Sequence, residues 1–234
     1  MLEAFPVKEI KESYKYDGFI AVREKPSWKD LFGKSFIRRT VLLFVLSFIT
    51  FGVQVSITVL EPVLFTSFLS YSAQAYTITT VLNVSSIIGT FLAAGMGGVR
   101  RKVSIPAFGS IVIAMLVMVV VMSYLNMGLF GVVLPLFVAT AFIFAVNTTV
   151  WLYAPELYPT RTRNLGTSWV IIGTIFGVIT IVLGVASVLP SYGIIGMAAF
   201  IAALYAVLVA VMLFMGLETA NKPLEAISES IKAE

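Results

Sequence analysis

Polar and ionisable side chains that lie inside long apolar stretches are the first candidates for chemistry in this sequence. Glu61 is the acid farthest inside such a stretch. An ionisable group in hydrocarbon is costly and usually functional, so Glu61 is a candidate for taking up a proton or attracting a cation. It follows Arg39 by 22 residues, about 33 Å of straight helix, which places it near the outer boundary of the stretch. A solvated carboxylate at this boundary, beside a break at Pro62, is the alternative interpretation.

A second group of candidates can line a central cavity. Gln54 lies about 22 Å along the same stretch and can donate to a hydroxyl or carbonyl group. Asn147, Thr148 and Trp151 lie on a later apolar stretch and can form the facing wall. The alternative for Trp151 is an anchor at a membrane interface, where tryptophan is enriched.

The composition excludes much other chemistry. The sequence contains no Cys and no His, which excludes disulfides, thiolate and imidazole metal sites, and catalysis by these side chains. A membrane enzyme would need a carboxylate or serine constellation, and no such cluster is found in the apolar stretches. We therefore expect no enzymatic activity, no catalytic residues, no cofactor and no metal.

The elements that position these residues are expected to be membrane-spanning helices. Of the 234 residues, 59% are hydrophobic and only 12% are charged. A span needs about 20 mainly apolar residues. Six stretches qualify: residues 40–60, 77–96, 103–124, 128–153, 165–189 and 192–217. The first can continue past Pro62 as a kinked extension. The fold class predicted is an all-α membrane protein with six transmembrane helices.

The basic residues indicate the orientation of these helices. All 16 Lys and Arg residues lie before the first stretch, in alternate connectors, or after the last stretch. The other connectors, near 70–76, 125–127 and 190–191, contain none. The positive-inside rule then places both termini in the cytoplasm of a multi-pass protein of the cell membrane. The net charge of +4 is thus explained by topology, and no nucleic-acid partner is expected.

The six stretches divide into two units of three helices. The third and sixth stretches are almost wholly apolar and are expected to face lipid, whereas the other four carry most of the polar side chains. Because three is odd, the two units insert with opposite orientation, as in an inverted-topology repeat. Gly173 and Gly177 in the fifth stretch have the spacing that lets two helix backbones approach closely.

Three short segments resemble the major facilitator superfamily, and its sugar-porter-like branch in particular. Residues 97–102, Gly-Gly-Val-Arg-Arg-Lys, are similar to the end of the family's D-R-x-G-R-R loop, without the leading Asp. The strongest match is Trp151-Leu-Tyr-Ala-Pro-Glu156-Leu-Tyr-Pro159, followed by Arg161, Arg163 and Gly166. Residues 217–227 resemble the P-E-T-K-G segment that follows the last helix. All three segments belong to the C-terminal half of a twelve-helix transporter.

The resemblance implies a transporter and a place for its substrate. In sugar porters the tryptophan at the position of Trp151 lies beside the substrate. The family's Gln pair and Asn on the first helix of this half are replaced here by Ile49, Thr50 and Val55. A hexose is therefore only one candidate, beside an organic acid, an aromatic compound or another metabolite.

The charged connectors are candidates for a cytoplasmic gate. Glu156 can pair with Arg163, or with Arg100 and Arg101, and Glu218 can do the same; Arg161 belongs to the same group. One exposed ion pair contributes only about 0–1 kcal/mol, but a network can bias which side of a transporter is open. Ordinary solvated helix ends are the alternative.

These observations predict one half of a secondary transporter that works by alternating access. Residues 1–35 are expected to be a cytoplasmic linker, 36–217 the six-helix domain and 218–234 a cytoplasmic tail. The expected partners are the lipid bilayer, a small polar solute, with the proton as candidate coupling ion, and a second six-helix half or a second copy. The alternative is a non-transporting membrane subunit or a remnant of a split transporter.

Overall fold

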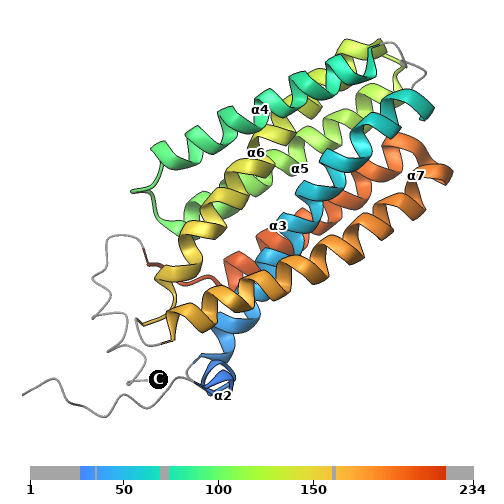
Figure 1. Cartoon of the computed structure of the whole chain (residues 1–234). Helices are drawn as coiled ribbons and strands as arrows, with labels where there is room; N and C mark the ends of the chain where they lie inside the picture. The colour runs from blue at the N-terminus through green and yellow to red at the C-terminus, as the bar shows by residue number, and fades with distance from the viewer. Residues whose placement is uncertain (1–26, 35, 69–73, 160–161, 220–234) are drawn as a thin grey trace, which may run out of the picture.

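The chain forms a bundle of long helices that lie side by side (Figure 1). The computed structural model describes residues 27–34, 36–68, 74–159 and 162–219. The described part is helical and contains no strand. Its helices are α2 (Trp28–Leu31), α3 (Ile37–Val63), α4 (Ala75–Gly95), α5 (Arg101–Tyr124), α6 (Gly128–Glu156) and α7 (Arg163–Met215), with a π-helix η1 (Leu64–Phe68) continuing α3.

Helix α7 contains two membrane spans. At 53 residues, a straight helix would be about 80 Å long, more than twice the thickness of a hydrocarbon core. Gly193 interrupts it with φ 57° and ψ −146°, a conformation that glycine adopts without steric cost. Figure 1 shows α7 turning back along the bundle at its far end. The six expected spans are thus present, but the last turn lies at Gly193, and the predicted connector at 190–191 is helical.

The first span is interrupted where the sequence indicated a break. Pro62 lies inside α3 and has no N–H to donate to the preceding turn. The chain then widens into η1, a form common as a short insertion in α-helices and frequent at functional sites. The predicted extension beyond Pro62 is confirmed as far as Phe68.

Glycines allow the helices to cross at backbone contact. Gly89 and Gly177 each lie 14 residues after the first residue of their helix (89 − 75 and 177 − 163). A Cβ atom on Gly89 would collide with the Ala141 carbonyl of α6, and one on Gly177 with the Phe48 carbonyl of α3. The second helix of each unit therefore crosses the first helix of the other unit, as an inverted repeat requires. Gly173 also packs on α3, which confirms the predicted close approach.

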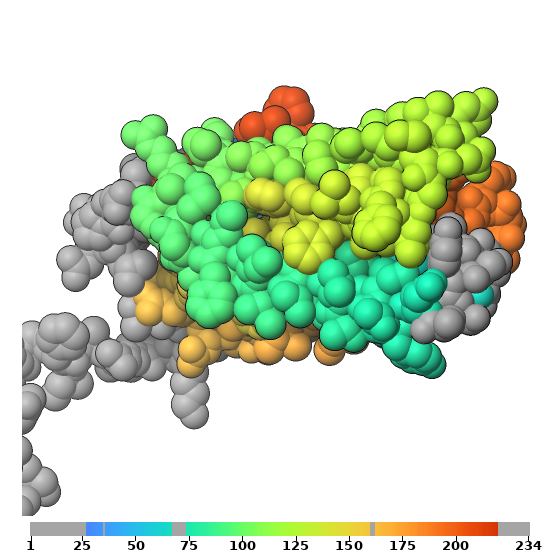
Figure 2. Space-filling view, turned by 90° about the horizontal axis from the view of Figure 1, so that it is seen from above, coloured from blue at the N-terminus to red at the C-terminus, as the bar shows by residue number. Residues whose placement is uncertain are grey.

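The third helices of the two units pack against each other. A Cβ atom on Gly109 of α5 would lie 2.8 Å from Val209 Cγ2 on the second limb of α7. Large apolar side chains cover the outer surface of the bundle; the most exposed include Phe91, Phe130 and Phe214. Figure 2 shows the face of the bundle formed largely by α4, α5 and α6, where the exposed large side chains include Ile87, Phe91 and Leu134. Such a surface suits a bilayer and would aggregate in water.

One end of the bundle, which we call the basic end, carries α2, the start of α3, the α4–α5 connector, the end of α6 and both ends of α7 (Figure 1). The described Lys and Arg residues lie in these segments. The opposite end carries the turn at 125–127 and Gly193. At the first of these turns, Asn126 and Gly128 have positive φ angles of 52° and 71°, which Asn and Gly tolerate best.

Candidate functional site

The helices α3 and α6 meet along a line of four side chains that we call the seam: Phe51, Gln54, Asn147 and Trp151. Gln54 Oε1 accepts a hydrogen bond from Asn147 Nδ2. One turn closer to the basic end, the Phe51 and Trp151 rings meet edge to face with centroids 5.3 Å apart. The structure thus brings together Gln54, Asn147 and Trp151, three of the predicted substrate-binding residues.

Exposure differs strongly along the seam. Asn147 is buried, Gln54 is half-buried, and Trp151 is 40% exposed. Gln54 lies 17 residues after the start of the 27-residue α3, far from either end of the span. A solute at the seam would therefore contact an aromatic ring and an amide pair deep in the membrane.

The fourth candidate, Thr148, lies beside the seam, but its hydroxyl is already engaged. Thr148 Oγ1 donates to the Phe144 carbonyl at 2.9 Å, and Thr58 Oγ1 donates to the Gln54 carbonyl at 3.0 Å. Serine and threonine commonly return such bonds to the preceding helical turn. These hydroxyls remain acceptors, but their protons are used within their own helices.

Glu61 lies away from the seam and is enclosed by the bundle. Its side chain shares a face of α3 with Val53 and Ile57, and only 1% of the residue is exposed. Among the described residues, no hydrogen-bond donor reaches Glu61 Oε1. The structure thus buries the carboxylate, in contrast to the alternative of a solvated boundary residue. Seven residues, or about 10 Å of helix, separate it from Gln54.

An ion pair joins α5 to α6 at the basic end. The Arg101 guanidinium donates to both Glu156 oxygens, from Nη2 at 2.8 Å and from Nε at 3.2 Å. The side chain of Arg101 is 6% exposed and that of Glu156 is 27% exposed. Two-pronged pairs between guanidinium and carboxylate are among the strongest hydrogen bonds in proteins.

The segment after α7 completes this group, which we call the Arg101 cluster: Arg101, Glu156, Glu218 and Thr219. Glu218 Oε1 accepts a hydrogen bond from the Arg101 backbone N–H at 3.2 Å. Thr219 Oγ1 donates to Glu156 Oε2 at 2.6 Å. The cluster therefore ties together the third helix of the first unit and the first and last helices of the second unit.

Arg100 and Arg163, two other predicted gate residues, lie at the same end of the bundle. Arg100 is exposed and precedes α5. Arg163 begins α7, and its buried Nε and Nη2 atoms have no hydrogen-bond partner among the described residues. Of the two pairings considered for Glu156, the structure thus shows the one with Arg101. Arg161 lies outside the described residues.

Sequence reasoning missed several contacts at the basic end. Tyr153 OH donates to the Leu217 carbonyl at 2.7 Å and accepts from the Leu217 N–H at 2.9 Å. Arg39 Nη1 donates to the Leu157 carbonyl at 2.8 Å. The partner in each case is a backbone group, which no side-chain motif reveals. The position of Thr219 directly after Glu218 was the one available signal for its part in the cluster.

A tyrosine and a tryptophan hold the start of α3. Thr40 Oγ1 donates to the Leu31 carbonyl at 2.7 Å and lies 3.0 Å from Tyr158 OH. Burial raises the pKa of Tyr158, so its phenol stays protonated and can donate to Thr40. Trp169 Nε1 donates to the Thr40 carbonyl at 3.0 Å. These bonds pack α2 against the bundle at the basic end.

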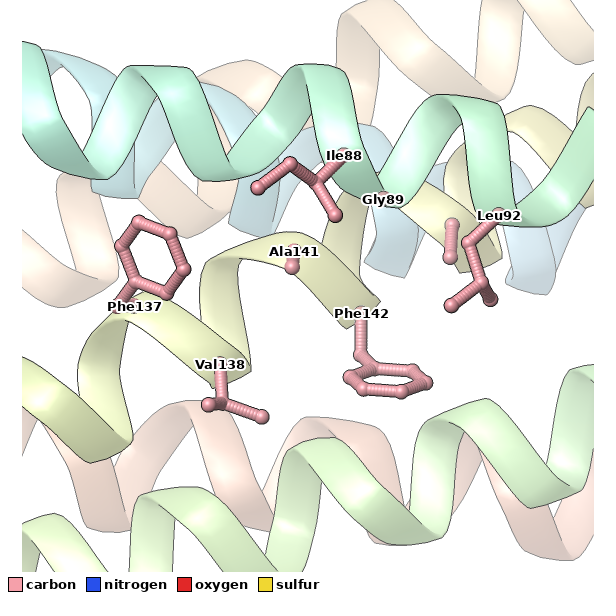
Figure 3. A pocket seen from close by; sticks show the side chains of 8 residues that line it. Ile88, Gly89, Leu92, Phe137, Val138, Ala141 and Phe142 are labelled. Atoms are coloured by element: carbon pink, nitrogen blue, oxygen red, sulfur yellow. The ribbon is translucent and has the colours of Figure 1, made fainter.

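A cavity of about 180 Å³ lies between α4 and α6, away from the seam. Figure 3 shows Ile88 and Leu92 of α4 above it, and Phe137 and Phe142 of α6 on the other side. The remaining lining residues are Gly89, Val138, Ala141 and Ala145, and none of the lining residues has a polar side chain. A polar solute would lose its hydrogen bonds with water there without replacement, so this cavity is a poor candidate for a solute site.

The six-helix bundle with its inverted units corresponds to one half of the major facilitator fold. Proteins with this fold are a class of membrane transport proteins. The sequence model of the family named Sugar (and other) transporter matches residues 5–230. The chain belongs to this family of transporters, which confirms the resemblance found in the sequence. Comparison with individually curated proteins gives no match.

Proposed function

We propose that this chain provides one wall of a secondary transporter that moves a small polar solute by alternating access. Membership in the Sugar (and other) transporter family supports transport in general. The observation that carries the proposal is the seam, where an amide pair lies deep within two spanning helices and a partly exposed tryptophan lies one turn closer to the basic end. Polar groups at this depth are costly, and they commonly mark the path of a solute.

A second six-helix half is the proposed partner, supplied by another polypeptide or by a second copy. Gln54 of α3 and Trp151 of α6 are partly exposed at the seam, whereas α5 and the second limb of α7 pack on each other. In an alternating-access transporter the substrate lies between two such halves. The other half would cover the seam and form the second wall of the cavity.

The Arg101 cluster and Arg163 are the proposed gate. The positive-inside rule places the basic end in the cytoplasm, so these residues lie where an inward-facing cavity would open. The cluster stabilises the packing of three helix ends in one arrangement. A second half that pairs with Arg163 would add a bond in one state of the transporter only, which shifts the balance between states.

Two measurements on the full chain test this proposal. The first is the mass of the protein component after purification in mild detergent, with identification of any co-purifying chain. We expect a dimer or a one-to-one complex with another six-helix chain. The second is uptake of radiolabelled solutes into liposomes containing that assembly. A monomer without a partner, together with no uptake of any solute, would refute transport by this chain and favour a non-transporting subunit.

A further inference from the structure

We infer that the seam accepts a planar aromatic ligand with a neutral carboxamide-like edge in preference to a polyhydroxylated sugar. The inference rests on the proposed function, because it names the class of substrate for the same site. Three properties of the seam support it: the aromatic side chains around it, the few hydrogen-bonding groups left for a ligand, and the absence of a nearby cation.

Two aromatic rings, Phe51 and Trp151, form one end of the seam, and a row of phenylalanines continues from there along α3 toward the basic end. Phe44, Phe48 and Phe51 follow one another at spacings of four and three residues on α3, and all are half-buried. The ring centroids of Phe44 and Phe48 lie 6.1 Å apart, and the Phe44 ring also packs on Trp169 of α7, with centroids 5.5 Å apart. Across the seam, Trp151 leaves 40% of its surface exposed. A planar ring can stack on or meet such groups edge to face, with a gain beyond simple burial.

Hydrogen-bonding groups are few by comparison. The neighbouring hydroxyls of Thr58 and Thr148 donate to their own helices. The bond between Gln54 and Asn147 uses the Gln54 oxygen and the Asn147 nitrogen. This arrangement leaves the Gln54 NH₂ group as donor and the Asn147 oxygen as acceptor. A carboxamide offers one acceptor and one donor, which match this donor and acceptor. A hexose has five hydroxyls, more than these two groups can bind.

Charge separates a neutral ligand from an anionic one. The sequence has no Lys, Arg or His at positions 40–99, 103–160 or 164–221, so no cation of these spanning segments faces the seam. A carboxylate bound there would be desolvated without a partner, which is costly. The wall formed by this chain therefore favours a neutral aromatic amide over the corresponding aromatic acid.

Calorimetric titration of the purified full chain, with any six-helix partner that co-purifies, tests the inference. Four probes separate its elements: benzamide, cyclohexanecarboxamide, which lacks the planar ring, benzoate, which carries charge, and D-glucose. We expect benzamide to bind most tightly. We expect Trp151→Leu to weaken benzamide binding about tenfold, Trp151→Phe to restore most of it, and Gln54→Leu to weaken the binding of both carboxamides.

The matched control is Trp28→Leu, because Trp28 is a comparably exposed tryptophan, at 46%, on α2. Its substitution should leave benzamide binding unchanged. Thermal unfolding of each variant establishes that it is folded. If Trp151→Leu does not fold, Trp151→Phe still tests the role of the ring. Tighter binding of D-glucose than benzamide would overturn the inference, as would equal binding of the two carboxamides or no effect of Trp151→Leu in a folded protein.

Liposome uptake separates failure of this inference from failure of the proposed function. Uptake of D-glucose that depends on Gln54, without benzamide binding, would leave transport standing and overturn the aromatic preference. Absence of binding by all four probes and of uptake of any solute would overturn both. Benzamide binding that depends on Trp151 supports the inference irrespective of which solute is finally transported.

Discussion

Single residues at the basic end show how a modest number of bonds fixes several helix ends. Arg101 contributes three donors to the cluster: its backbone N–H, Nε and Nη2. Its side chain is almost fully buried, so loss of the Glu156 carboxylate would leave a desolvated cation. Removal of one partner of a buried ion pair therefore costs more stability than the intact pair contributes.

We predict that Arg101→Ala lowers the free energy of unfolding by about 1.5–3 kcal/mol, the range for hydrogen bonds to charged groups. The partial exposure of Glu156 keeps the loss below that of a fully buried pair. The measurement is the midpoint of thermal unfolding in detergent. Lys102→Ala, an exposed neighbour, should change it little. The double variant Arg101→Ala/Glu156→Ala should lose less than the sum of the two single variants; strict additivity would contradict direct pairing.

Glu61 provides a test of proton coupling. We predict that Glu61→Gln abolishes the pH dependence of solute uptake and leaves membrane insertion intact, because the amide is nearly isosteric with the acid but does not titrate. Among the described residues, Glu61 forms no ion pair; the ion pair found there joins Arg101 to Glu156. Uptake at a series of pH values in liposomes makes the measurement. An unchanged pH profile in the variant would exclude Glu61 from the coupling mechanism.

The seam was only partly predictable at the residue scale. Helical rise placed Gln54 deep in its span, and the tryptophan motif indicated Trp151. The bond between Gln54 and Asn147 joins residues 93 positions apart, and no single-sequence pattern specifies such a register. The burial of Glu61 was equally hidden, since rise along a helix gives depth but not the face on which a side chain lies.

At the scale of elements, apolar length predicted the helices well. The expected stretch 103–124 corresponds to α5 (Arg101–Tyr124), and 128–153 to α6 (Gly128–Glu156). The largest difference is at Gly193, where proline at 190 suggested an earlier turn. Pro190 removes one backbone N–H but keeps its place inside the helix, whereas the positive φ angle at Gly193 breaks the helical path.

Glycine crossings give a prediction for whole helices. We expect Gly177→Ala and Gly89→Ala each to destabilise the bundle by about 1–3 kcal/mol, as overpacked cores do, because each new Cβ atom would collide with a backbone carbonyl. Gly95→Ala is the matched control, since no atom lies within 4 Å of its added Cβ. Thermal unfolding in detergent compares the three. Equal midpoints would mean that the helices do not cross at these positions.

At the scale of the whole molecule, Arg163 is the residue most suited to report on a second half. Its buried Nε and Nη2 atoms lack partners among the described residues, and a carboxylate from the opposing half would satisfy them in a state in which the helix ends at the basic end move apart. We predict that Arg163→Ala shifts the balance between inward-open and outward-open states more than it lowers the amount of folded protein.

The absence of cysteine from the sequence makes this shift directly measurable. A cysteine introduced at Thr58, which is exposed beyond the seam, can be labelled by an impermeant maleimide from one side of the membrane at a time. Arg163→Ala should change the ratio of the two labelling rates, whereas Arg100→Ala, an exposed neighbour of the cluster, should change it less. A lower yield of folded protein with an unchanged ratio would favour a purely structural role for Arg163.

The turn at Gly193 has a consequence for how the chain enters the membrane. It joins the two limbs of α7 without an intervening loop, and the residues around it carry no charge. Translocation of this turn therefore requires no ionised side chain to cross hydrocarbon. During biogenesis the last 50 or so residues of the bundle can enter the bilayer as one helical hairpin, with the second limb returning the C-terminus to the side from which the first began. A charge placed beside Gly193 would impede this single step, and with it the arrival of Glu218 at Arg101.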